Sequence, residues 1–154
     1  MSEAPQPAFS IEKVYVKDLS LEVPGGPQTF MQPEQPQLEI QLEHQSQRVN
    51  EFLFEVILVI TVTAKHDART LFLVEASQAG VFQIRNVPEA ELGPVLGIVC
   101  PNILYPYARE TVSDVINRAG FPPVLLAPVN FEALYQQRAA QAGQAPGPQI
   151  EIAH

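Results

Sequence analysis

Apolar and polar residues alternate along the first half of the chain with a period of two, which is typical of β-strands. This pattern predicts four strands, over residues 9–23, 38–43, 52–64 and 70–84. A polar stretch at 65–69 is expected to turn the chain between the last two strands, and the prolines and glycines at 24–27 end the first. The Pro- and Gln-rich run that leads to Pro36 is predicted to be a connection rather than an element.

Strict alternation assigns the side chains of the first strand to two faces. One face carries Phe9, Ile11, Lys13, Tyr15, Lys17, Leu19 and Leu21, and the other carries Glu12, Val14, Val16, Asp18, Ser20 and Glu22. Asp18 and Glu22 therefore share a face, which Glu75 of the fourth strand can join. These carboxylates form either a surface for a basic partner or a solvated face that protects the sheet from wrong pairing. The second is the commoner reason for exposed charge on strands.

The third strand is apolar on both faces. One face is continuous from Phe52 to Val62, and on the other Leu53, Ile57 and Val59 lie among polar residues. Both faces of this strand therefore need cover, which predicts a layer of helices on one side and a further contact on the other.

The second half of the chain changes to the three- and four-residue spacing of helices. One helical face is formed by Tyr105, Ala108, Val112, Val115, Ile116 and Ala119. Pro106 suits the first turn of this helix, and Gly120 is a natural left-handed residue at its end. A further helix is predicted over 131–142 with Asn130 as its N-cap, and a short one around 89–96, broken by Pro94 and Pro101.

Four strands followed by helices indicate an α+β fold, in which the C-terminal helices pack on one face of a four-stranded antiparallel sheet. Residues 9–142 are expected to form a single domain. The Pro-rich residues 1–8 are predicted to be disordered, and the Ala-, Gln-, Gly- and Pro-rich residues 143–154 to be a flexible tail.

The composition narrows the classes of partner. The 154 residues carry nine Lys and Arg against seventeen Asp and Glu, a net charge of −8, so nucleic acid and anionic membranes are poor partners. The N-terminus lacks the basic flank and apolar run of a signal peptide, and one cysteine cannot form an internal disulfide, which together indicate a cytoplasmic protein. The apolar runs are too short for membrane insertion, which needs about 20 residues.

No residue pattern indicates catalysis or a cofactor. Cys100 lies between Val99 and Pro101, with no basic neighbour to lower its pKa, so a buried packing role is expected. The histidines, His44, His66 and His154, are too scattered for a zinc site and are expected at the surface. No glycine-rich phosphate loop is present. We therefore predict a binding protein that is neither an enzyme nor a nucleotide binder.

Several long motifs, in order along residues 9–135, carry a specific resemblance to the SecB family of bacterial export chaperones. They are Val14-Tyr-Val-Lys-Asp18, Glu22-Val-Pro24, Cys100-Pro-Asn-Ile-Leu-Tyr-Pro-Tyr-Ala-Arg-Glu110 and Leu126-Ala-Pro-Val-Asn-Phe-Glu-Ala-Leu-Tyr135. The resemblance implies an ATP-independent chaperone that assembles as a dimer of dimers, a homotetramer with its helices at the centre. It would hold unfolded preproteins ready for translocation and deliver them to the SecA motor.

The resemblance also implies site residues. The SecA-docking surface would consist of Asp18, Glu22, Leu73 and Glu75. The groove for unfolded clients would be lined by Leu38, Ile40, Leu42, Tyr107, Phe121, Leu125 and Tyr135. The tail would add a second contact to the motor. From the residues alone, an acidic scaffold or adaptor that recognises a folded partner remains the alternative, and an enzyme that uses Cys100 is a distant third.

Overall fold

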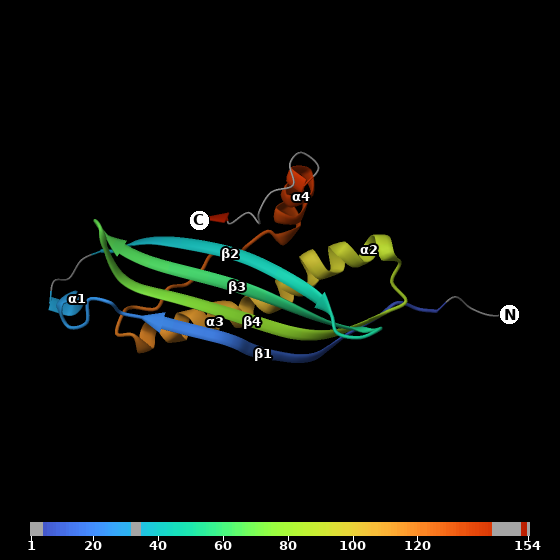
Figure 1. The fold of residues 1–154 in the computed structure, drawn as a ribbon, viewed down its shortest axis with the longest axis horizontal. Coiled ribbons are helices and arrows are strands. Elements are labelled where there is room, and N and C mark those ends of the chain that lie inside the picture. Colours follow the sequence, from blue (N-terminus) through green and yellow to red (C-terminus); the bar gives the residue numbers. More distant parts are fainter. Residues whose placement is uncertain (1–4, 32–34, 143–151, 154) are drawn as a thin grey trace.

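The computed structural model describes residues 5–31, 35–142 and 152–153. Its core element is an antiparallel sheet in the order β1-β4-β3-β2-β5, in which four long strands carry a short fifth pairing at one edge (Figure 1). The strands are β1 (Ala8–Glu22), β2 (Gln37–Arg48), β3 (Leu53–His66), β4 (Arg69–Arg85) and β5 (Ile152–Ala153). The predicted four-stranded antiparallel sheet is thereby confirmed.

Two β-bulges in β1 correct the predicted assignment of its faces. The register of β1 against β4 shifts between Ile11 and Lys13 and again between Val16 and Asp18, so Glu12 and Lys17 are each an extra residue. Each bulge turns the following residues to the other face. The positions paired with the buried, helix-facing residues of β4 are then all apolar: Phe9, Ile11, Val14, Val16, Leu19 and Leu21.

Residues 89–118 form a nearly continuous helical segment, where the sequence predicted breaks at the prolines. It consists of α2 (Glu89–Pro94), a π-helical turn η1 (Val95–Val99) and α3 (Cys100–Arg118). The backbone N–H of Cys100 donates to the carbonyl of Val95, five residues back. This wider turn carries the chain from Pro94 to Pro101 without ending the helix. Pro106 consequently lies inside α3 and not in its first turn, which is a second correction.

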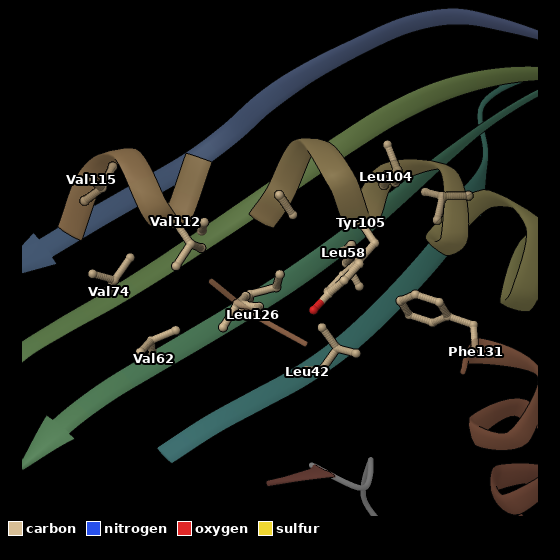
Figure 2. Close-up of a cluster of buried hydrophobic side chains, with 14 of the residues drawn as sticks. Leu42, Leu58, Val62, Val74, Leu104, Tyr105, Val112, Val115, Leu126 and Phe131 are labelled. Carbon is tan, nitrogen blue, oxygen red and sulfur yellow. The ribbon is translucent and has the colours of Figure 1, made fainter. Parts of the chain in front are cut away.

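Helix α3 packs on β3 and β4 and covers one face of the sheet (Figure 1). The predicted apolar side chains Tyr105, Ala108, Val112, Val115 and Ile116 are buried on it. In Figure 2, Val112 and Val115 of α3 lie over Val74 of β4, while Tyr105 lies over Leu58 of β3. Gly120 ends the helix with φ of 95°, the left-handed conformation that the sequence predicted.

The remaining helices are α1 (Gln28–Met31), a single turn within the predicted connection, and α4 (Phe131–Ala142). The side chain of Asn130 accepts a hydrogen bond from the N–H of Ala133 at 3.0 Å, which confirms the predicted N-cap of α4. Within the described residues, no helix is long and apolar enough to cross a membrane.

The predicted terminal segments lie mostly outside the described residues. Of residues 1–8, the structure describes 5–7 without regular structure and Ala8 as the first residue of β1. Of residues 143–154, it describes Ile152 and Ala153, which pair with Leu42 and Gln41 of β2.

Candidate functional site

An apolar hollow of about 330 Å³ lies between the helix-facing side of β2 and the connector that joins α3 to α4, residues 121–130. We call it the client hollow, after the groove for unfolded clients that the family resemblance implies. It is lined by Leu38, Ile40, Leu42, Ile60, Tyr105 and by residues 124–129. Four of the predicted groove residues are thereby brought together: Leu38, Ile40, Leu42 and Leu125. Leu42 is 4% exposed and belongs to the core, whereas Leu38 and Ile40 are half-buried.

The connector is held to the domain at both ends. At its start the ring of Phe121 packs between Phe30 and Phe72, with ring centroids 5.1 and 4.7 Å away. At its end Phe131 is 3% exposed and packs edge-on against Tyr105. Between these anchors the connector is stiffened by prolines, so the wall of the hollow is formed before any ligand arrives.

The middle of the connector presents two adjacent leucines in opposite environments. Leu126 is 5% exposed and lies among the core residues in Figure 2, and the hydroxyl of Tyr105 donates a hydrogen bond to the next carbonyl, that of Ala127. Leu125 is 84% exposed. A leucine this exposed beside an apolar hollow extends the apolar surface that an incoming chain would meet.

Three of the predicted groove residues do not line the client hollow. Phe121 is used to anchor the connector, and Tyr107 is half exposed on α3. Tyr135 of α4 packs against two glycines of the helical segment before α3: a Cβ atom on Gly97 would lie 2.6 Å from its ring, and one on Gly93 would lie 2.8 Å from its hydroxyl. These glycines leave the space that Tyr135 occupies.

The lining residues that sequence reasoning missed are Ile60, Tyr105, Val124 and the apolar residues 126–129. The helical spacing of Tyr105 predicts a core position, and its burial is confirmed, but the residue also lines the hollow. No periodicity distinguishes these positions, because the connector has no repeating structure and its path depends on contacts at its ends.

The opposite face of the sheet is acidic at one end of β1 and β4. After the second bulge, Asp18 pairs with Ser77, Ser20 with Glu75, and Glu22 with Leu73. Cross-strand partners lie on the same face, so the predicted docking residues Asp18, Glu22, Leu73 and Glu75 share it. Asp18, Glu22 and Glu75 are exposed and Leu73 is half-buried. We call these four residues the acidic surface.

Cys100 is fully buried, and burial raises the pKa of its thiol to about 12. The thiol is therefore protonated at neutral pH, which confirms the packing role and opposes nucleophilic chemistry. His44, which is predicted at the surface, is half-buried: this burial, with a smaller contribution from Arg138, lowers its pKa to about 4. Among the residues that the structure describes, no cluster of His, Cys, Asp or Glu could hold a metal ion.

The sequence matches a known protein family and several of its members over most of their length. The family described as preprotein translocase subunit SecB matches residues 2–142. The protein-export protein SecB of Chromobacterium violaceum is 62% identical over 140 residues, which cover 91% of this chain and 93% of the relative. That of Nitrosospira multiformis is 60% identical over 147 residues, covering 96% and 92%.

A solved structure shares the fold at much lower identity. The SecB-like chaperone of Mycobacterium tuberculosis, in complex with an antitoxin peptide, superposes with a TM-score of 0.63 at 18% identity, covering 79% of this chain and 90% of that one.

The family match spans most of the chain, and the relatives are matched over nearly their whole length. The chain therefore belongs to the SecB family of protein-export proteins.

Proposed function

We propose that this protein is a tetrameric, ATP-independent cytoplasmic chaperone that receives extended segments of unfolded preproteins in the client hollow and passes them to SecA through the acidic surface. Its role as a protein-export chaperone follows from its family. The observation that supports the client site is the apolar hollow beside β2, bordered by the 84% exposed Leu125.

The chemistry of the hollow suits an unfolded client. Its lining is almost entirely aliphatic, with Tyr105 as its aromatic member. Apolar contacts are non-directional, so they favour exposed apolar segments without selecting one sequence. A folded protein buries such segments and offers little to bind. Several hollows in one assembly would act on the same chain, which raises the effective concentration for each later contact.

The acidic surface suits a different partner. Its three exposed carboxylates lie on the face of the sheet opposite the helices, whereas the client hollow lies on the helix side. Two partners can therefore be bound at once without overlap. Clustered exposed carboxylates around an apolar residue attract a basic surface and set its orientation.

The edge of β1 supports the proposed assembly as a dimer of dimers. Its helix-side row contains Phe9, Ile11, Val16, Leu19 and Leu21, each between 37% and 46% exposed. An edge strand with a continuous apolar row is an aggregation hazard unless another surface covers it. We expect a mass in solution of four times the 17.0 kDa of the chain. A monomer at micromolar concentration in light scattering would contradict the assembly.

The chaperone is distinguished from an adaptor for folded proteins by the state of its client. We expect the protein to bind an unfolded precursor and to bind the same precursor at least about one hundred-fold more weakly after it has folded, because folding removes the apolar segments from water. Affinities for both forms are measured by titration calorimetry, using a slowly folding precursor. Equal affinity for the two forms would support the adaptor instead.

A further inference from the structure

A buried carboxylate lies on the sheet face that carries the acidic surface. Glu55 of β3 is 6% exposed. Its carboxylate accepts hydrogen bonds from the hydroxyl of Tyr15, from Nζ of Lys17 at 2.9 Å and from Nε2 of Gln47 at 2.9 Å. The hydrogen bond from Tyr15 holds the pKa of this carboxyl below its usual range, so the group is ionised at neutral pH.

Two of these partners come from a strand that is not a neighbour of β3. Tyr15 and Lys17 belong to β1, Gln47 belongs to β2, and β4 separates β1 from β3. Tyr15 is paired with Ala79 of β4, whose small side chain lets the tyrosine reach across to β3. The hydrogen bonds to the carboxylate of Glu55 therefore hold the middle of β1 to β3, at the centre of the sheet.

The hydrogen bond between Lys17 and Glu55 is made at the second bulge of β1. Lys17 is the extra residue between Val16, which pairs with Gln78, and Asp18, which pairs with Ser77. Glu55 thus holds the side chain of the bulged residue itself. Without the bulge, one-residue alternation would turn Asp18 and Glu22 to the helix side and Leu19 to the outer face.

We infer that Glu55 is a positioning residue for the acidic surface: it anchors the bulge at Lys17 and thereby keeps Asp18 and Glu22 on the outer face in the orientation that SecA binds. This inference rests on the proposed docking function. Glu55 itself is too buried to form part of an exposed contact, so its effect on docking is transmitted through β1.

The test measures the affinity of SecA for the assembled full-length protein by calorimetry. Glu55→Gln keeps the size of the side chain but removes the charge that pairs with Lys17, and it should weaken SecA binding roughly three- to ten-fold, the range of coupling within one network. Glu12→Gln is the matched control, because it removes the same charge at the other bulge, where the exposed carboxylate of Glu12 accepts a hydrogen bond from the hydroxyl of Ser10 on the same strand. It should leave SecA binding unchanged, and both variants should bind unfolded precursor normally.

A double-mutant cycle separates positioning from a general electrostatic or structural effect. Asp18→Ala with Glu22→Ala should itself weaken SecA binding. If Glu55 acts through these residues, Glu55→Gln should cause little further loss in that background. Equal losses in both backgrounds would overturn the inference. If the Asp18/Glu22 variant bound SecA normally, the proposed docking surface would fail, and the inference with it.

Lys17→Met provides a second route in case Glu55→Gln impairs folding. The side chain of Lys17 is 44% exposed, so its replacement leaves no cavity. The variant should show the same selective loss of SecA binding. Unchanged SecA binding by Lys17→Met, with the Asp18/Glu22 variant impaired, would overturn the anchoring role while leaving the docking surface intact.

Discussion

Replacing Ile40 by arginine is expected to weaken the binding of an unfolded precursor by at least about ten-fold. Ile40 lines the client hollow and is half-buried, so the new guanidinium would face the aliphatic surface that takes the apolar side chains of the client. A bound client would then have to desolvate a charge without a partner. The affinity is measured with a fluorescently labelled unfolded precursor.

The matched control for Ile40→Arg is Gln41→Arg. It adds the same side chain one position along β2, on the opposite face of the sheet, and should leave precursor affinity within about two-fold. Leu42 is a poorer probe, because it is 4% exposed and a charge there would damage the core. Normal precursor binding by Ile40→Arg would show that clients bind elsewhere.

The second large effect is expected on stability. Phe72→Ala should lower the free energy of unfolding by about 3–5 kcal/mol, because Phe72 is 1% exposed and its loss leaves a large cavity in the core. The same change removes the ring that Phe121 contacts, so the start of the connector would also loosen. Urea denaturation at one fixed protein concentration measures the change, since association contributes to stability.

Leu125→Ala is the control for Phe72→Ala, because both variants truncate an apolar side chain near the connector. Phe72 contacts the connector through Phe121, whereas Leu125 belongs to the connector itself. Leu125 is 84% exposed, so its loss should change the free energy of unfolding by no more than about 0.5 kcal/mol. A destabilisation as large as that of Phe72→Ala would mean that Leu125 is covered in the assembled protein.

Local patterns were sufficient to predict most of the elements. The third and fourth strands and α4 were placed within two residues of their bounds, the N-cap at Asn130 and the left-handed Gly120 were correct, and the apolar face of α3 is buried. These features depend on the spacing of apolar residues and on the backbone preferences of single residues, which are properties of short segments.

The prolines of the helical segment misled the prediction for a physical reason. A proline inside an α-helix lacks a donor and clashes with the preceding turn, so Pro94 and Pro101 predict breaks. A single π-helical turn between them changes the hydrogen-bonding partners and keeps the segment helical. The N–H of Cys100 then bonds the carbonyl of Val95, five residues back, and the local rule for proline does not predict this.

The sequence by itself determined the α+β class, the order of the elements and, through long motifs, the family. Only the tertiary structure decided which face of β1 each side chain occupies, because two bulges interrupt the alternation and both lie in the pairing of β1 with β4. The position of the wall of the client hollow likewise depends on the tertiary structure. Its wall is a connector without periodicity, positioned by ring contacts at Phe121 and by burial of Leu126 and Phe131, which are contacts between residues far apart in the chain.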